Sequence, residues 1–230
     1  HDIIEMTIGE PDVPTPPELV EAAYDAMRNG RTTYSNGAGE TGLRNALAKR
    51  YAHRSQRQIT NDQVLCFPGA QTALFTVLMG VAESGCEVLV GDPMYATYEG
   101  VIRASGANVV PVPLRPENGF RIAVQDIAER ISPKTSAILL TTPHNPTGSI
   151  LTDAEIEAIG ALAIAHDLWI ISDEVYSELV FDGAKFSSPL SRSELADRVI
   201  VVSSISKSHA APGFRSGWCI GPCAFTKALL

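Results

Sequence analysis

Short runs that are apolar at nearly every position constrain the fold of this chain more than any other feature. The clearest are "SAILLT" at 136–141, "LWIIS" at 168–172 and "VIVVSS" at 199–204. A strand with one face in water alternates polar and apolar residues, whereas a strand covered on both faces does not need to. These runs therefore predict parallel strands inside a sheet that has helices on both faces.

The rest of the chain alternates between such runs and segments with helical periodicity, which is typical of repeated βα units. Strands are predicted at 64–67, 87–90, 108–112, 136–141, 169–172, 199–203 and 217–220. Helices are predicted at 17–29, 41–53, 71–83, 95–105, 124–131 and 153–166. The fold class expected is α/β, an open and mostly parallel sheet of seven strands.

The amino-acid composition limits which kinds of molecule the protein is expected to bind. The net charge of −8 and the lack of a Lys/Arg block argue against binding to nucleic acid or to an anionic membrane surface. The longest apolar runs are well short of the roughly 20 residues that span a bilayer. The four cysteines are scattered, so we expect reduced thiols and a cytoplasmic location. A small molecule is the expected partner.

In open parallel sheets, ligands bind outside the carboxyl ends of the strands. Polar or unusual residues follow five of the predicted strands, in "PGAQTA", "GDPMY", "TPHNPTG", "DEVY" and "SISK". In "SSISKSHAAPGFR", Lys207 has the hydroxyls of Ser204 and Ser206 before it and Arg215 after it. This segment combines a nucleophilic amine with several hydrogen-bond donors, and an anionic ligand would fit there.

Taken singly, these motifs have simpler explanations: "NPTG" as a turn, Asp173 as a helix cap, Lys207 as a solvated surface residue. Taken together and in order, "YSNGAGETGLR", "GAQTAL", "DPMYATY", "HNPTG", "SDEVY" and "SISKSHAAPGFR" resemble the fold-type I pyridoxal-phosphate enzymes, specifically the class I/II aminotransferases. The resemblance runs from "IGEPDVPTP" to "GFRSGW". It implies an N-terminal arm at 1–15 and a cofactor-binding large domain at 16–230.

The resemblance also implies how pyridoxal 5'-phosphate is held. Lys207 would form a Schiff base with its aldehyde, and Asp173 would lie against the pyridine nitrogen. Its phosphate would be bound by Arg215, by the hydroxyls of Ser204 and Ser206, and by the backbone N–H groups of Ala70 and Gln71.

Further roles follow from the same resemblance. Asn145 and Tyr176 would hydrogen-bond the phenolic oxygen of the ring, with Asn145 also near substrate, and Tyr95 would stack on the ring. Gly9 would lie near the substrate carboxylate. Tyr34 would reach the phosphate of a neighbouring subunit, which implies a homodimer with composite sites. Ordinary packing for Tyr95 and a simple turn for Gly9 stay open, and no metal-ligand set emerges.

The reaction implied is a ping-pong transfer of an amino group from an L-amino acid to a 2-keto acid, with Lys207, Asp173 and Tyr176 as catalytic residues. The sequences of these motifs are most similar to those of the bacterial branch that includes aspartate and arginine–pyruvate transaminases. The preferred amino donor and keto acid acceptor stay open. A C–S β-lyase of the same fold and a non-catalytic sensory domain are the alternatives. Family members continue into a small C-terminal domain, which we expect this chain to lack.

Overall fold

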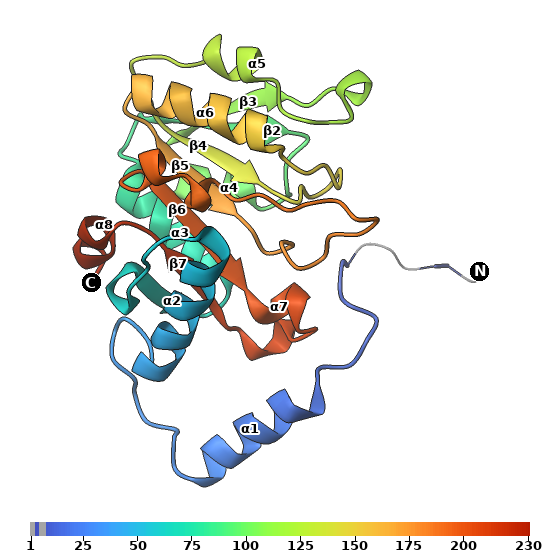
Figure 1. The fold of residues 1–230 in the computed structure, drawn as a ribbon, viewed down its shortest axis with the longest axis vertical. Helices are drawn as coiled ribbons and strands as arrows, with labels where there is room; N and C mark the ends of the chain where they lie inside the picture. Colours follow the sequence, from blue (N-terminus) through green and yellow to red (C-terminus); the bar gives the residue numbers. More distant parts are fainter. Residues whose placement is uncertain (1–2, 5–7) are drawn as a thin grey trace.

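A computed structural model describes residues 3–4 and 8–230. Of the predicted arm at 1–15, residues 1–2 and 5–7 therefore lie outside the described part. Residues 8–16 have neither helix nor strand and run along the outside of the molecule (Figure 1). The arm is attached to the body by a hydrogen bond in which Thr15 Oγ1 donates to the carbonyl oxygen of Ala210 at 2.5 Å.

The core of the molecule is a seven-stranded sheet with the order β1-β7-β6-β5-β4-β2-β3. Strand β7 is antiparallel to both β1 and β6, and the other neighbouring pairs are parallel. The predicted α/β fold with a mostly parallel seven-stranded sheet is confirmed. The strands are β1 (Val64–Phe67), β2 (Glu87–Asp92), β3 (Asn108–Pro113), β4 (Thr135–Thr141), β5 (Trp169–Asp173), β6 (Val199–Ser204) and β7 (Gly217–Ile220).

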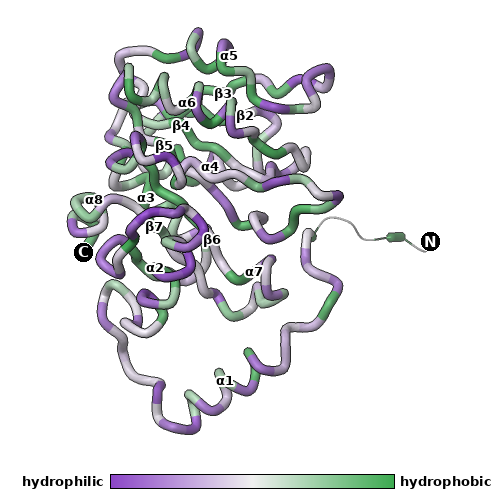
Figure 2. The backbone as a smooth tube through the Cα atoms, in the orientation of Figure 1, coloured by the Kyte–Doolittle hydropathy of each residue, from purple (hydrophilic) through white to green (hydrophobic). Residues whose placement is uncertain are grey.

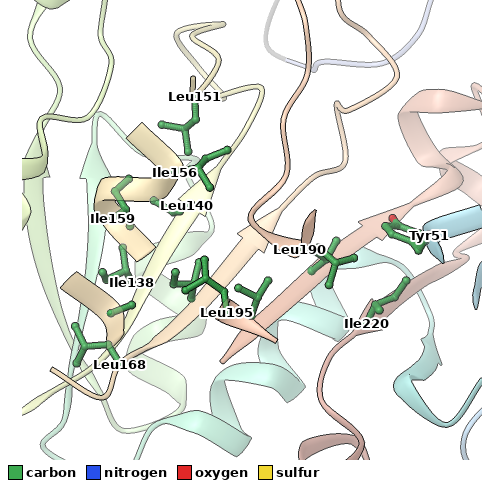
Figure 3. Close-up of a cluster of buried hydrophobic side chains, with 14 of the residues drawn as sticks. Tyr51, Ile138, Leu140, Leu151, Ile156, Ile159, Leu168, Leu190, Leu195 and Ile220 are labelled. Atoms are coloured by element: carbon green, nitrogen blue, oxygen red, sulfur yellow. The ribbon is translucent and has the colours of Figure 1, made fainter. Parts of the chain in front are cut away.

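Helices cover both faces of this sheet, because consecutive residues of each central strand point to opposite sides. In β4, Ile138 and Leu140 belong to one apolar cluster, and Ala137 and Leu139 belong to the other. The first cluster, part of which is drawn in Figure 3, packs under α2 (Thr41–Ser55), α5 (Val124–Ala128) and α6 (Asp153–Ala165). The second packs under α3 (Ala70–Val81), α4 (Tyr98–Ala104) and α8 (Cys223–Ala228). Figure 2 shows the strands as the hydrophobic centre of the chain.

Local signals explain where several helices begin. Thr152 and Glu155 form a capping box at the start of α6, in which Thr152 Oγ1 accepts from the Glu155 N–H at 3.2 Å and Glu155 Oε2 accepts from the Thr152 N–H at 2.8 Å. Helix α4 begins at Tyr98, not at the predicted residue 95, because the preceding residues form a turn in which the Tyr98 N–H donates to the Tyr95 carbonyl oxygen at 3.0 Å.

No helix is predicted in the segment that follows β6, but the structure has one there. Residues Ile205–Ser208 form a one-turn helix, α7, which contains Lys207. Ser204 caps it, since its Oγ accepts a hydrogen bond from the Ser206 N–H at 3.3 Å. Helix α8 was also not predicted.

The antiparallel direction of β7 determines where Arg215 lies. Because β7 runs against its neighbours, it begins at the edge where β1 and β6 end, and Gly217 pairs with both Phe67 and Ser204. The backbone there is so close that a Cβ on Gly217 would lie 2.4 Å from the carbonyl carbon of Gly69 and 2.5 Å from the nitrogen of Ala70. A side chain at position 217 would push the start of α3 away from the sheet.

Helix α1 (Pro17–Arg28) stands apart from the sheet at the far end of the view in Figure 1 and has no buried residue. Its apolar side chains Val20, Tyr24 and Met27 are exposed. Among the described residues, no helix has the length and apolar character needed to cross a membrane.

We expect Gly217→Ala to lower the free energy of unfolding by about 1–3 kcal/mol or more, because the added methyl group meets backbone atoms that cannot move aside. The matched control is Gly100→Ala in α4, where a Cβ meets nothing within 4 Å. That change should leave stability equal or raise it by about 0.5–1 kcal/mol. Denaturant unfolding of both variants tests this, and equal stabilities would contradict the role of Gly217.

Candidate functional site

A cavity of about 200 Å³ opens at the carboxyl edge of the sheet. It is lined by residues from β4, β5, β6, α3, α4 and α7, from the loops after β2, β4 and β5, and from the segment between α7 and β7. The predicted residues that the structure brings together in this cavity are Ala70, Gln71, Tyr95, Asn145, Asp173, Tyr176, Ser204, Ser206, Lys207 and Arg215. The two remaining predicted residues, Gly9 and Tyr34, lie elsewhere.

One end of the cavity gathers positive charge and hydrogen-bond donors. Ala70 and Gln71 are the first two residues of α3, where backbone N–H groups have no intrahelical acceptor. Ser204 accepts the capping hydrogen bond, which leaves its hydroxyl proton available as a donor. The Arg215 guanidinium lies so close to Gly69 that a Cβ at position 69 would be 2.1 Å from Nη2. Positive charge, hydroxyls and amides therefore converge there.

Arg215 is itself held in place by the backbone. It has a left-handed conformation with φ 49°, and its Nη1 donates to the carbonyl oxygen of Pro212 at 2.7 Å. Gly69, on the other side, has φ 92°, a region that glycine adopts without strain. The guanidinium of Arg215 is thus held beside Gly69, at the start of α3.

Asp173 ends β5 and is buried in the middle of the cavity wall. Its Oδ2 accepts a hydrogen bond from the Tyr98 hydroxyl at 2.8 Å, and its Oδ1 accepts one from the Val175 N–H at 3.2 Å. Burial raises the pKa of Asp173 to about 6, although both hydrogen bonds favour the charged form. The carboxylate forms no ion pair with any described side chain, so a cationic group in the cavity would find a free partner there.

Tyr98 is the residue of this site that sequence reasoning missed. It is fully buried, and its hydroxyl also contacts Thr141 Oγ1 at 2.8 Å. Desolvation and the nearby Asp173 carboxylate raise the pKa of Tyr98 well above its usual value, so the phenol keeps its proton. The available signal was the spacing in "DPMYATY": Tyr98 lies three residues after Tyr95, and their rings pack edge to face at 5.6 Å.

Lys207 lies between this cavity and a second one of about 500 Å³, and Tyr176 lines both. The Lys207 amine donates a hydrogen bond to the carbonyl oxygen of Gly9 in the arm. Asn145 Nδ2 donates to the Tyr176 hydroxyl oxygen at 3.1 Å, and burial raises the pKa of that phenol. The amine and the phenol therefore stand where the two cavities meet.

Tyr34 and His144 do not line this cavity. Tyr34 is fully exposed, at 105%, in a surface hollow near Arg31 and Leu43. His144 Nδ1 contacts Thr147 Oγ1 at 2.8 Å, and burial lowers the pKa of His144 to about 4. In the part of the chain that the structure describes, no three His, Cys, Asp or Glu side chains are grouped to hold a metal ion.

Comparison with known proteins adds an independent line of evidence. The family model described as "Aminotransferase class I and II" matches residues 1–230. The arginine–pyruvate transaminase of Pseudomonas aeruginosa is 47% identical over 97% of this chain, and the aspartate aminotransferase of Geobacillus stearothermophilus is 34% identical over all of it. The solved aspartate aminotransferase of Thermotoga maritima superposes with a TM-score of 0.95 at 35% identity and covers 99% of this chain. The chain spans 57%, 58% and 60% of the lengths of these three proteins.

We expect the free energy of unfolding of the cofactor-free protein to fall as the pH rises from 3.8 to about 6. In this window the folded Asp173 still binds a proton that the unfolded chain has released, so the higher pH favours unfolding. Asp173→Asn should remove about 2 kcal/mol of this dependence. Glu174, whose pKa burial raises to about 7, adds a slope of the same sign that the variant retains. Denaturant unfolding across this range measures the slope, and an unchanged slope in Asp173→Asn would contradict the assignment.

Tyr98→Phe should destabilise the protein by about 1 kcal/mol, because the Asp173 carboxylate and the Thr141 hydroxyl both lose a buried partner. It should also move the midpoint of the pH dependence upward, since a donor that favours the charged carboxylate is gone. Tyr95→Phe, in a partly exposed neighbour on the same turn, is the control and should change neither quantity. If Tyr98→Phe behaves as that control does, the proposed link from Tyr98 to Asp173 is wrong.

Proposed function

The chain belongs to the class I and II aminotransferases, and we propose that it is the cofactor-binding part of an enzyme that moves an amino group from an L-amino acid to a 2-keto acid. The observation that supports this most directly is that Lys207, Asp173 and Arg215 line one cavity. An amine, a buried carboxylate and an anion-binding guanidinium in one cavity are what this chemistry requires.

The class I and II aminotransferases use pyridoxal phosphate, and the cavity residues fit this cofactor. The cluster of Arg215, Ser204 and the first amides of α3 suits a phosphate dianion. Gly69 and Gly217 keep that space open, because a Cβ at either position would collide with the groups around it. Asp173, buried without a cationic partner among the described residues, suits a protonated ring nitrogen.

When bound, pyridoxal phosphate supplies an electron-accepting ring next to the amino group of the substrate. Asp173 would hold a proton on the ring nitrogen, because its charge is stabilised by a cation opposite it. Lys207 would hold the cofactor through its amine and, once released by the substrate amine, take the proton from the substrate α-carbon. Its position between the two cavities supports both tasks.

The Asn145 and Tyr176 side chains would orient the ring from its other edge. Their mutual hydrogen bond leaves the Tyr176 hydroxyl proton free to be donated to the ring oxygen. Tyr95 would cover one face of the ring, and Gly9 in the arm would lie beside the substrate. These roles are proposals, which the placement of the side chains around one cavity supports.

We also propose that the working enzyme is a homodimer in the cytoplasm. Tyr34 is fully exposed and lies outside the cavity of its own chain, which leaves its phenol available to a phosphate bound by a second copy. Cys66, Cys86, Cys219 and Cys223 are all free thiols, which fits a reducing compartment. The names of the relatives make L-arginine and L-aspartate the first donors to test, with pyruvate as the first acceptor for arginine.

The half-reaction with single amino acids tests the proposal. In the full-length protein, the absorbance of bound cofactor should change when the correct L-amino acid is added without acceptor. Lys207→Ala should still bind the cofactor and should slow this change by several orders of magnitude, because the covalent catalyst is lost. Lys49→Ala, an exposed lysine in α2, is the control.

Near-normal conversion by Lys207→Ala would refute the assignment of the catalytic amine. Release of pyruvate and ammonia from a cysteine conjugate, without the change in cofactor absorbance, would favour the β-lyase alternative. Absence of any spectral response to every amino acid would favour a sensory role.

A further inference from the structure

Glu174 is a buried carboxylate that the proposed chemistry does not use. It follows Asp173 directly, and its side chain is on the opposite face of β5, together with Ser172. Only 1% of Glu174 is exposed. A carboxylate is seldom buried this completely unless its oxygens have hydrogen-bond partners, so the partners of Glu174 indicate what it does.

The partners of Glu174 come from both ends of one chain segment. Its Oε1 accepts hydrogen bonds from the Ser172 hydroxyl at 3.0 Å and from the Ser188 hydroxyl. Its backbone N–H donates to the carbonyl oxygen of Val202 in β6 at 2.9 Å, and its own carbonyl oxygen accepts from the Ser177 N–H at 3.0 Å. Glu174 thus joins two strands to the start and the end of residues 175–188.

This segment, drawn in orange in Figure 1, has no helix or strand between its ends. Tyr176 lies at its beginning, and Phe181 near its middle is 72% exposed. Three ion pairs also hold the segment at the surface, Glu178 with Arg50, Glu178 with Arg54, and Lys185 with Asp153. The Arg54 guanidinium lies over the Phe186 ring at 5.4 Å, and Asn145 is hydrogen-bonded to Tyr176. Exposed ion pairs contribute little to order, since water and salt compete for both charges. The buried Glu174–Ser188 hydrogen bond closes the segment, that is, it holds the two ends of residues 175–188 together.

We propose that Glu174 is a positioning residue for Tyr176: by binding Ser172 and Ser188 behind β5, its carboxyl group closes the segment 175–188 and so holds the Tyr176 phenol in the cavity. This inference rests on the role proposed above for Tyr176. Glu174 touches neither Lys207 nor the cavity, and it acts through the backbone that it shares with Tyr176.

The surroundings of Glu174 support a geometric role that does not need a charge. The pKa of Glu174 is raised to about 7, chiefly by burial and to a smaller extent by the Asp173 carboxylate. Hydrogen bonds from Ser188 and Ser172, and the nearby Arg54 of α2, oppose this rise. Serine hydroxyls can donate to a carboxylate, to a carboxylic acid or to a carboxamide oxygen. Glutamine at this position should therefore keep the segment closed, and alanine should not.

The experiment compares Glu174→Ala, Glu174→Gln and Ser188→Ala in the full-length protein loaded with pyridoxal phosphate. Ser188→Ala removes one hydroxyl and keeps the protein measurable if Glu174→Ala folds poorly; Ser188→Thr restores the hydroxyl. Glu157→Gln is the matched control, because Glu157 is exposed on α6 in the hollow that Glu174 also lines. Two quantities are measured: amide hydrogen exchange across 176–187, and the pH at which the absorbance of the bound cofactor titrates.

Glu174→Ala and Ser188→Ala should speed exchange across 176–187 about tenfold. They should also shift the cofactor titration by about half a pH unit to one unit, in the same direction as Tyr176→Phe. Glu174→Gln, Ser188→Thr and Glu157→Gln should stay close to wild type. In the Glu174→Ala, Tyr176→Phe double variant the titration should match that of Tyr176→Phe alone, because both changes remove the same contact.

Wild-type exchange together with a wild-type titration in Glu174→Ala and Ser188→Ala would overturn the inference. So would a titration shift in Glu174→Ala that is added in full to that of Tyr176→Phe, since the effect would then bypass Tyr176. The proposed function fails in a different way: the wild-type protein would bind no pyridoxal phosphate. Exchange across 176–187 of the cofactor-free variants would still show whether Glu174 closes the segment.

Discussion

The site depends on the burial of one carboxyl group, that of Asp173, at the end of a central strand. Removing a charge from water costs several kcal/mol unless a partner replaces the water. Here Tyr98 and the Val175 N–H supply hydrogen bonds, but no described side chain supplies a positive charge. The cavity wall is therefore electrostatically incomplete without a cation. A ligand with a protonated ring nitrogen would complete it, and the binding of that ligand and the stability of the fold are linked.

The fold could be predicted largely from its apolar runs, because a strand buried on both faces leaves little freedom in where it begins and where it ends. Asp173 and Ser204 could be placed at one edge of the sheet for the same reason: the strands that they end are parallel neighbours. The direction of β7 is not visible in "GWCI", since a short buried strand reads the same in both directions. That direction brings Arg215 to the edge of the sheet where Lys207 lies. The resemblance to the aminotransferases predicted that the two side chains lie close together, whereas hydrophobic periodicity alone could not predict it.

Other parts of the site could not be predicted from local pattern because they depend on tertiary contacts. Tyr98 belongs to a predicted helix, and its ring packs in the hydrophobic core. Only the position of β5 beside it makes its hydroxyl a donor to Asp173. The pairing of Asn145 with Tyr176 joins two loops that are 31 residues apart. Helix α7 is a single turn, which is too short for a periodic signal in the sequence. Residue types were thus easier to assign than the contacts between them.

The two ends of the cavity differ in how they are built into the molecule. At the end near Arg215, a side chain added at Gly217 would collide with the backbone of Gly69 and Ala70, and one added at Gly69 would collide with the Arg215 guanidinium. The other end, at Lys207, meets a second cavity lined by Gly9, which belongs to an arm that leads into α1, a helix without a buried residue. Sequence changes in the arm can therefore reshape the entrance beside Lys207 while the hydrophobic core stays as it is. The shape of this entrance is thus uncoupled from the packing that stabilises the sheet.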